Sequence, residues 1–366
     1  MYLTNEELAA ALELRDLTNP LQGEHALQPL VADVLERLAG LWRIPIRLHR
    51  GERVVTVDDN YDALAYPADG PARDRRYTRY VDETRLLRTH TSASIPGALR
   101  ELGGQLRDEL VAVPGLVYRR DAIDRLHVGE PHQLDLWRLS AQPLGRDDLE
   151  LMVAVVVESL VPGARRRALA ATHPYTVDGL EVEILRDGEW VELLECGLAH
   201  PHVLAGAGLE GYGLAMGIGL DRALMLRKGV RDIRLLRSGD PRVAAQMLTL
   251  DQYTEVSAQP PARRDLSIAC AQGLGAEELG DRVRRALGED AELVEQVELL
   301  SRTPAAELSH VARERLGMRR GQENLLVRVV VRHPTRSVAR TEANLLRDRI
   351  YGALHEGDRA VYADSG

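Results

Sequence analysis

GYGLAMGIGLDRALMLRKGVRDIRLLR, residues 211–237, is the stretch that decides the fold. Apolar residues alternate with three of its glycines, which are Gly213, Gly217 and Gly219. Glycines at this spacing let a backbone pass close to a ligand or to a neighbouring strand. Arg222 follows where the strand turns into a helix, and its planar charged fork suits a phosphate. The alternative is a buried corner with a surface arginine, and a lone glycine-rich turn does not decide between the two.

The composition is that of an ordinary globular protein. The chain has 366 residues, 45% hydrophobic and 28% charged, with a net charge of −9, and its length suits two domains. No apolar run approaches the ~18–20 residues of a membrane span, and the acidic N-terminus is unlike a signal or transit peptide. Cys196 and Cys270 are too few for a disulfide framework or a metal site. We expect a cytoplasmic protein that does not bind membranes.

Residues 1–240 predict an α+β arrangement in which helices flank an antiparallel sheet. Apolar residues at helical spacing predict helices over 27–41 and 147–161. Alternating segments predict strands at 44–50, 53–59, 86–95 and 116–140, and two more within 173–204 joined by a turn at 186–188. The absence of βαβ alternation, of GxGxxG and of GxxxxGK[ST] argues against a Rossmann or P-loop nucleotide site.

Two of these strand-like segments are unusually polar. They carry His90, Ser92, Arg119, Asp121, His127, His132, Gln133 and Asp135. Alternation predicts that Arg119 and Asp121 share one face of a strand, and that Gln133 and Asp135 do the same. A solvated sheet face with paired charges is the alternative, although such a face would not usually need two histidines and an amide.

The sequence changes character after residue 245. Residues 246–260 predict a linker, and 261–366 predict the order strand, helix, strand, strand, helix, strand of a small ferredoxin-like α/β sandwich. Ten Arg and four Asp or Glu lie between Arg313 and Arg349. Such a basic strip is most simply a solvated face, and phosphate contact is the rival interpretation.

Several motifs, in the right order, resemble phenylalanyl-tRNA synthetase, a class II aminoacyl-tRNA synthetase, over nearly the whole chain. The segments that look like its active site are LLRTHTSA (86–93), VYRRDAID (117–124), HQLD (132–135) and GLAMGIGLDRALMLRKGVRDIRLLRSGD (213–240). YTEVSAQPPARRDLSIA and RTEANLLRDRI look like its ferredoxin-fold anticodon-binding domain. Both parts on one chain are similar to the single-chain organellar form. The resemblance implies a catalytic domain at 1–245, an anticodon-binding domain at 261–366, and a monomer or homodimer with no second subunit.

The resemblance gives roles in ATP binding to five side chains. Arg119 is placed like the arginine that holds the α-phosphate of ATP, and Arg222 like the one on the γ-phosphate. Asp121 matches an acidic residue near the adenine, and His127 a histidine near the phosphates. Glu192 resembles a carboxylate that helps hold Mg²⁺ on ATP, and oxygen ligands suit this cation. Two guanidinium groups would stabilise the charge that builds at the attacked phosphorus.

The amino-acid site follows from the same resemblance. His90, Ser92, Gln133 and Asp135 match positions that hold the substrate's carboxylate and ammonium groups. Asp135 replaces the usual Glu, which keeps the charge but shortens the side chain by one methylene. The implied reaction forms an aminoacyl-adenylate and then transfers the aminoacyl group to tRNA, expected to be the Phe isoacceptor, bound through the C-terminal domain. No covalent enzyme intermediate is needed, so positioning and electrostatics would supply most of the catalysis.

The presumed side-chain pocket departs from the family. His173-Pro174-Tyr175 stands for Phe-Pro-Phe, Leu214 and Met216 stand for two Phe, and Pro131, Ile95 and Glu195 stand for Phe, Gln and Gly, while Ala215 is retained. A Tyr and a His can still flank an aromatic ring, so we expect phenylalanine or a related aromatic amino acid. If Glu195 points inward, it would favour a cationic or hydrogen-bond-donating substituent. The alternative is a side chain turned to water.

The chain contains no Phe at all. Ordinary usage would give on the order of a dozen. Retuning of the pocket explains only a few of these positions. The hypothesis is that the gene avoids Phe codons, so that synthesis of the protein does not depend on charged tRNA for Phe. Relatives that lack Phe only around the pocket would contradict it.

Two further functions compete with an active tRNA-charging enzyme. One is a paralogue that makes an aminoacyl-adenylate or aminoacyl-tRNA for a specialised pathway. The other is a non-catalytic regulator that binds tRNA or amino acid. Arg119, Arg222 and Glu192 are all present, which argues against the non-catalytic alternative.

Overall fold

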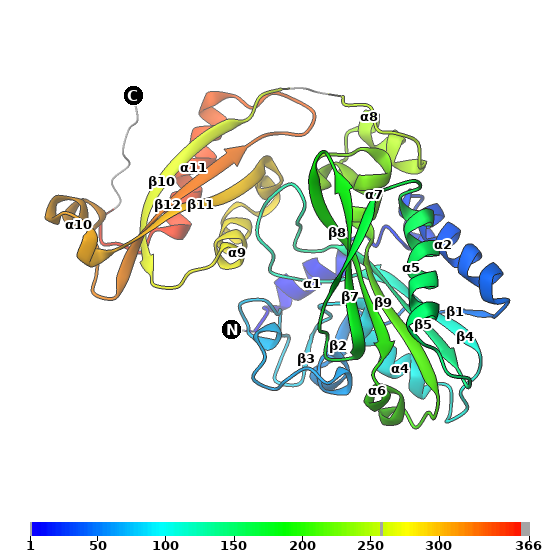
Figure 1. The fold of residues 1–366 in the computed structure, drawn as a ribbon. Helices are drawn as coiled ribbons and strands as arrows, with labels where there is room; N and C mark the ends of the chain where they lie inside the picture. The colour runs from blue at the N-terminus through cyan, green and yellow to red at the C-terminus, as the bar shows by residue number, and fades with distance from the viewer. Residues whose placement is uncertain (1, 257–258, 360–366) are drawn as a thin grey trace. The chain divides into compact units, whose positions relative to one another are not determined.

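The computed structural model describes residues 2–256 and 259–359. The chain forms two compact units: the first is Met1–Arg119 with Glu130–Tyr253, and the second is Arg120–Gly129 with Thr254–Gly366. Figure 1 shows the elements of both. The two predicted domains, 1–245 and 261–366, are each one continuous stretch of chain. The second unit instead also includes the ten-residue segment 120–129, which lies far upstream. Part of the predicted linker, residues 257–258, lies outside the described residues.

The first unit is built on a seven-stranded sheet in the order β1-β4-β5-β9-β8-β7-β6. Its strands are β1 Ile46–Leu48, β4 Glu109–Leu116, β5 His132–Ser140, β6 Arg166–Ala170, β7 Thr176–Arg186, β8 Glu189–Ala199 and β9 Tyr212–Gly219. Every neighbouring pair is antiparallel except β1–β4, which is parallel. The predicted antiparallel sheet is therefore mixed at this edge. A separate two-stranded sheet pairs β2 Val54–Thr56 with β3 Arg85–Leu87.

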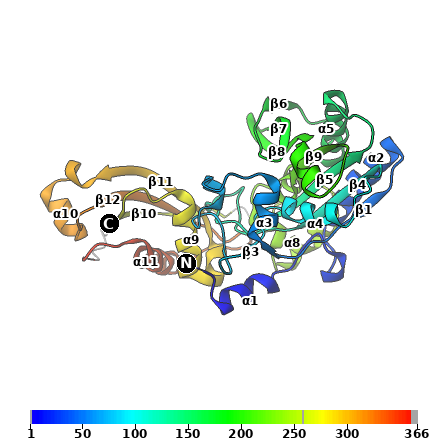
Figure 2. The ribbon, with the colours of Figure 1, turned by 90° about the horizontal axis from the view of Figure 1, so that it is seen from below.

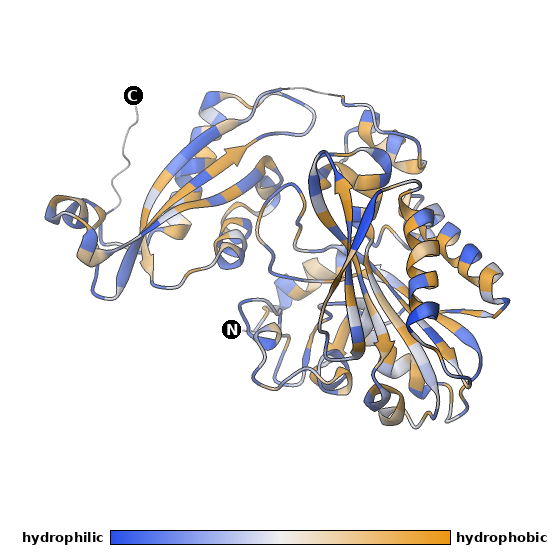
Figure 3. Ribbon diagram, in the orientation of Figure 1, coloured by the Kyte–Doolittle hydropathy of each residue, from blue (hydrophilic) through white to orange (hydrophobic). Residues whose placement is uncertain are grey.

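Three helices of the first unit pack on one another and on this sheet: α2 Leu27–Trp42, α5 Arg146–Leu160 and α7 Leu220–Lys228. The buried residues of α5 recur at helical spacing, and Figure 3 shows the resulting alternation of hydrophobic and hydrophilic patches along α5 and α2. The predicted helices at 27–41 and 147–161 are thus confirmed. The remaining helices of this unit are α1 Asn5–Glu13, α3 Val57–Asn60, α4 Ile95–Arg100, α6 Pro201–Gly206 and α8 Pro241–Ala244.

Four predicted strands are shorter than the sequence suggested. β1 and β2 cover only part of the predicted 44–50 and 53–59, and α3 begins directly after β2. β3 ends at Leu87, and a 3₁₀ helix over Thr91–Ser94 follows in place of strand. β4 ends at Leu116 and β5 begins at His132, so Arg119, Asp121 and His127 lie on a loop. The argument that Arg119 and Asp121 share a strand face is therefore wrong. Asp124 accepts backbone N–H bonds from Leu126 and His127 at 2.7 and 2.9 Å, and such local side-chain bonds compete with a strand ladder.

The second unit is a three-stranded antiparallel sheet in the order β10-β12-β11 with three helices. Its elements are β10 Ala262–Ala271, α9 Ala276–Leu287, β11 Val294–Pro304, α10 His310–Leu316, β12 Gln322–Val331 and α11 Arg340–Leu354. Figure 2 shows α11 beside the strands of this unit, and α9 and α11 contribute to one core with them. All but the first residue of the predicted last strand, 359–363, lies outside the described residues. The ferredoxin-like sandwich therefore stays a prediction.

The segment 120–129 is built into the core of the second unit. Ile123 is 7% exposed and belongs to the same hydrophobic cluster as α9, β11 and β12. Its carbonyl accepts the Val297 N–H at 3.0 Å, and Arg284 donates to the carbonyls of Asp121 and Ala122. Gly280 leaves room for this segment, because a Cβ there would lie 3.0 Å from the Asp121 carbonyl oxygen.

Membrane-spanning helices do not occur within residues 2–256 and 259–359. None of the helices described there is long and apolar enough to cross a bilayer.

Candidate active site

The register of the central strands puts the predicted substrate residues on one face of the sheet. Gln133 lies opposite Gly219, and Asp135 lies opposite Gly217. Glu195 on β8 flanks Gly217 from the other side. Because side chains alternate along a strand, Gln133, Asp135 and Glu195 point to the same side of the sheet. The prediction that Gln133 and Asp135 share a face is confirmed, and Glu195 joins them.

Asp135 is a buried carboxylate without a cationic partner among the described residues. The hydroxyls of Thr91 and Ser92 each donate to Oδ2 at 2.9 Å, and the Trp137 indole donates to Oδ1 at 3.4 Å. Burial raises the pKa of Asp135 to about 6 despite these three hydrogen bonds. A buried anion that is held only by neutral donors is suited to receive an ammonium group.

His90 lies beside this carboxylate site on the loop after β3. It is 9% exposed, and neither ring nitrogen has a hydrogen-bond partner within residues 2–256 and 259–359. The ring stacks on Tyr66 with centroids 5.5 Å apart. Burial, and then the nearby charge of Arg119, lower the pKa of His90 to about 3, so the imidazole is neutral at physiological pH. The adjoining Thr91 N–H donates to the Gln133 side chain at 3.2 Å, which ties this loop to β5.

The two predicted phosphate-binding arginines belong to the first unit. Arg119 is held by a 2.8 Å bond from Nε to the Thr89 carbonyl. Arg222 stands in the first turn of α7, where it donates to the Glu192 carbonyl at 2.9 Å and lies 3.3 Å from the Glu192 carboxylate. Glu192 is 46% exposed, so its carboxylate remains open to solvent beside a cation.

His173 and Glu195 form an ion pair on the β8 side of Gly217, across β9 from Asp135. His173 Nε2 lies 2.9 Å from Glu195 Oε1, and the two side chains are 15% and 38% exposed. The hydrogen bond to Glu195 raises the pKa of His173, against the effect of burial. The Glu195 side chain thus lies on the same face of the sheet as Asp135 and is paired with His173, while it stays partly exposed. Its predicted place in the substrate pocket stays a prediction.

Tyr175 packs into the hydrophobic core of the first unit. It is 8% exposed and stacks on Trp137, with centroids 6.2 Å apart and an interplanar angle of 24°. Tyr66 lies 6.2 Å away on another side. Ala215 is opposite Trp137 in the register and belongs to the same core cluster.

Four predicted residues do not join this face of the first unit. Leu214 and Met216 point to the opposite side of β9 from Ala215 and are fully buried, so their predicted place in the substrate pocket is wrong. Asp121 and His127 belong to the second unit. The Asp121 carbonyl accepts from Arg284, and His127 Nδ1 lies 2.8 Å from Asp124 Oδ2. Their predicted roles toward ATP stay predictions.

Sequence reasoning missed Tyr66, Thr91 and Trp137, and gave no role to the pair His132–Asp221. His132 is fully buried, with Nδ1 3.0 Å from Asp221 Oδ1. Leu17 N–H donates to its Nε2 at 3.0 Å, so the ring proton sits on Nδ1 and points at Asp221. Trp137 and Thr91 could have been found from their spacing to Asp135 and Ser92, whereas Tyr66 is distant in sequence and gave no signal.

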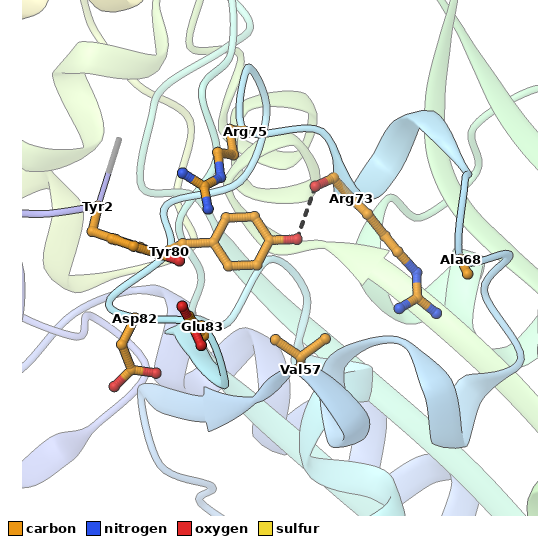
Figure 4. A pocket seen from close by; sticks show the side chains of 8 residues that line it. All are labelled: Tyr2, Val57, Ala68, Arg73, Arg75, Tyr80, Asp82 and Glu83. Carbon is orange, nitrogen blue, oxygen red and sulfur yellow. Dashed lines mark hydrogen bonds between the residues drawn. The ribbon is translucent and has the colours of Figure 1, made fainter.

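A surface pocket of about 420 Å³ lies elsewhere on the first unit. Figure 4 shows its lining, in which the Tyr80 hydroxyl donates to the Arg73 carbonyl at 2.8 Å. The lining residues are Tyr2, Val57, Ala68, Arg73, Arg75, Tyr80, Asp82 and Glu83. None of these lining residues is a predicted site residue, so this pocket is separate from the group formed by Gln133, Asp135 and Glu195.

Comparison with known proteins gives the class of this fold and site. Residues 22–247 match the family described as tRNA synthetases class II core domain (F). The chain belongs to this family, the class II aminoacyl-tRNA synthetases, and is an aminoacyl-tRNA ligase.

The relatives within that class are phenylalanine–tRNA ligase alpha subunits. The one from Prochlorococcus marinus (strain MIT 9313) is 34% identical over 64% of this chain and 70% of its own length. The one from Leptospira biflexa (serovar Patoc, strain Patoc 1 / Ames) is 33% identical over 54% of this chain and 61% of its own length. A pyrrolysyl-tRNA synthetase from Desulfitobacterium hafniense aligns over 63% of this chain and 78% of its own, with a TM-score of 0.48 and 18% identity.

The names of these relatives correct one prediction. They are alpha subunits, and so are single components of an enzyme that has more than one kind of chain. The expectation that no second subunit is needed, which came from the likeness to the single-chain form, is therefore wrong.

Proposed function

We propose that this chain activates an aromatic amino acid with ATP, forming the aminoacyl-adenylate, and transfers the aminoacyl group to tRNA in the cytoplasm. The observation that carries the proposal is Asp135, a buried carboxylate that lies beside the partly exposed Gly217 of β9 and has only neutral hydrogen-bond partners among the described residues. The ammonium group of an amino acid would supply the missing positive charge. Phenylalanine or a related aromatic amino acid is supported by the names of the relatives.

The polar groups around Asp135 have complementary tasks in this proposal. Gln133 and the neutral, unpartnered His90 would bind the substrate's carboxylate and orient it. Ser92 would hold Asp135 in position through its 2.9 Å bond. Arg119 and Arg222 would bind the α- and γ-phosphates of ATP. Preorganised charges of this kind lower the barrier because they need no rearrangement as charge develops.

Glu192 is the residue that would hold Mg²⁺ with ATP. Among the described residues, no group of three or more His, Cys, Asp or Glu side chains is arranged as a metal site. This fits a cation that is bound mainly by phosphate oxygens and water with one carboxylate from the protein. The exposed carboxylate of Glu192, 3.3 Å from Arg222, meets that requirement. When bound, Mg²⁺ would neutralise phosphate charge.

Binding of tRNA, proposed to be the Phe isoacceptor, is assigned to the second unit as an anticodon-binding domain of the ferredoxin-like type. The support is its order of elements and its arginines. The relatives also imply that a second kind of chain takes part in the complete enzyme, and we include such a partner in the proposal.

The test is amino-acid-dependent ATP–pyrophosphate exchange, followed by charging of tRNA, both measured on the complete enzyme with its partner chain. Exchange with an aromatic amino acid, and charging of tRNA, would support the proposal. Exchange without charging would favour a paralogue that serves a specialised pathway, and no exchange with any amino acid would favour a non-catalytic regulator.

Arg222→Ala provides the residue-level test. We expect loss of exchange by at least on the order of a hundredfold with little change in thermal stability, because one guanidinium would be lost from the phosphates. Arg222→Lys keeps the charge without the planar fork, and we expect intermediate activity. Retention of exchange by Arg222→Ala would disprove the assigned role.

A further inference from the structure

The open space on the substrate face lies over Gly217. Gly217 is partly exposed, whereas residues 213–216 and 218 of the same strand are buried. A Cβ built at Gly217 would meet only Asp135 Oδ2 within 4 Å, at 3.9 Å. The glycine thus leaves a gap between its two cross-strand neighbours, Asp135 and Glu195, whose Cα atoms are about 10 Å apart at ordinary strand spacing.

The apolar space beside Ala215 is already filled by the chain's own rings. Tyr175 lies 6.2 Å from Trp137 and 6.2 Å from Tyr66, measured between ring centroids. Rings in direct contact have centroids about 4.5–7 Å apart. A further ring between either pair would need roughly twice that separation, so a substrate ring has no place there while these side chains stay packed.

The backbone that carries Tyr175 is fixed on both sides. The Thr176 N–H donates to the His173 carbonyl at 3.2 Å, which closes a turn. The His200 N–H donates to the Tyr175 carbonyl at 2.9 Å. A substrate side chain is therefore directed along the gap over Gly217, toward Glu195 and His173, and away from Ala215.

We propose, building on the function proposed above, that the substrate is an aromatic amino acid with a hydrogen-bond donor, a hydroxyl or amino group, at the far end of its ring. Its ammonium group binds Asp135, its ring lies across Gly217, and its terminal donor bonds to the carboxylate of Glu195. His173 holds that carboxylate through the 2.9 Å ion pair.

The selectivity comes from the cost of covering Glu195. An unsubstituted ring would remove water from this carboxylate and return no hydrogen bond, which is unfavourable for a charged acceptor. A buried polar site rejects an analogue that lacks the partner group by about 10⁴–10⁵-fold. Glu195 is 38% exposed and keeps part of its hydration, so we expect a smaller preference, on the order of tenfold to a hundredfold.

The experiment compares kcat/KM in ATP–pyrophosphate exchange for phenylalanine, tyrosine and 4-aminophenylalanine. The unmodified chain should prefer tyrosine or 4-aminophenylalanine to phenylalanine by a factor on the order of ten to a hundred in kcat/KM. Glu195→Leu should bring the ratio to about one or reverse it, and Glu195→Gln, which keeps an acceptor oxygen without the charge, should retain a reduced preference for both donor-bearing substrates. Glu181 pairs with Glu195 in the register on the side away from Gly217, so Glu181→Gln is the matched control and should leave the ratios unchanged.

The outcomes separate this inference from the function on which it rests. Exchange that is equally fast with phenylalanine and tyrosine, and a ratio that Glu195→Leu does not change, would overturn the inference alone. Absence of exchange with all three amino acids would overturn the proposed aromatic specificity as well. Thermal shifts induced by each amino acid give a second readout, and we expect the same order of preference in them.

Discussion

Asp135 carries, at the scale of one residue, a cost in stability that its proposed role in binding an ammonium group would explain. Its pKa lies at about 6 instead of the model-peptide value of 3.8, because burial disfavours the charged form. A folded-state pKa above the unfolded one means that the stabilising effect of the bound proton is lost as the pH rises through about 6. At neutral pH the ionised carboxylate then costs about 3 kcal/mol, from roughly two pKa units at ~1.4 kcal/mol each.

We therefore expect Asp135→Asn to raise the melting temperature by several degrees at pH 8 and to abolish amino-acid-dependent exchange. The difference in melting temperature should shrink toward pH 5, where wild-type Asp135 is protonated and resembles the amide. Calorimetry at the two pH values measures the effect. An equal or larger gain at pH 5 would show that burial of charge is not its cause.

His132 connects the N-terminal segment to the first turn of α7, and we expect it to position Arg222. The backbone N–H of residue 132 donates to Asp221 Oδ2 at 2.8 Å in any variant. His132→Asn also keeps a side-chain N–H donor near the Nδ1 position and so retains the side-chain bond to Asp221, whereas the side chain in His132→Gln keeps only the contact with Leu17. Loss of the side-chain bond to Asp221 should raise the KM for ATP on the order of tenfold in His132→Gln, since a shift of a fraction of an ångström is costly in a preorganised site. His132→Asn should lose stability but hold the KM for ATP. Equal KM values for the two variants would contradict a positioning role.

At the scale of elements, the central strands and long helices were predictable and the polar connections were not. α2 and α5 follow from apolar residues at helical spacing, because each helix buries one regular face. β5 and β9 are buried on both faces over most of their length, and their short alternating runs still indicate strand. Residues 117–131 alternate in the same way in sequence. Their backbone groups are instead satisfied by side chains such as Asp124 and Arg284, which no local pattern reveals.

The segment 120–129 gives a testable consequence at this scale. Ile123→Ala should destabilise the second unit by about 2–4 kcal/mol, because it removes a buried side chain from that core. Hydrogen exchange should then speed up in peptides from α9, β11 and β12, and stay unchanged in peptides from β5 and β9. Leu126, which is 39% exposed on the same segment, is the control position, and Leu126→Ala should change little. Faster exchange confined to the large sheet would assign the segment to the first unit.

At the scale of the whole molecule, the basic strip of the second unit, residues 313–349, offers less unpaired positive charge than its ten arginines suggest. Six of its ten arginines have carboxylate partners, namely Arg319, Arg328, Arg332, Arg336, Arg347 and Arg349. The other four, Arg313, Arg315, Arg320 and Arg340, have none among the described residues. Only these four are left to offer unneutralised charge to a phosphate backbone.

We expect the combined change of Arg315, Arg320 and Arg340 to Ala to raise the KM for tRNA and to flatten its salt dependence, with ATP–pyrophosphate exchange unchanged. Arg328→Ala, which removes an arginine already paired with Asp265 at 2.8 Å, is the matched control and should have a smaller effect. A KM for tRNA that does not respond to the triple change would place tRNA contacts elsewhere. The assay needs the complete enzyme, including any partner chain.

The sequence by itself indicated the class of this protein, because several of its motifs resemble, in the right order, those of the class II synthetases. Alternation along the strand also predicted that the side chains of Asp135 and Gln133 point to the same face of the sheet. Only the tertiary structure decided that Glu195 faces the same gap as Asp135, that Tyr175 and Trp137 fill the space beside Ala215, and that residues 120–129 join the second unit. Each of these depends on pairing between strands or packing between segments far apart in the chain, and such contacts leave no period in the sequence.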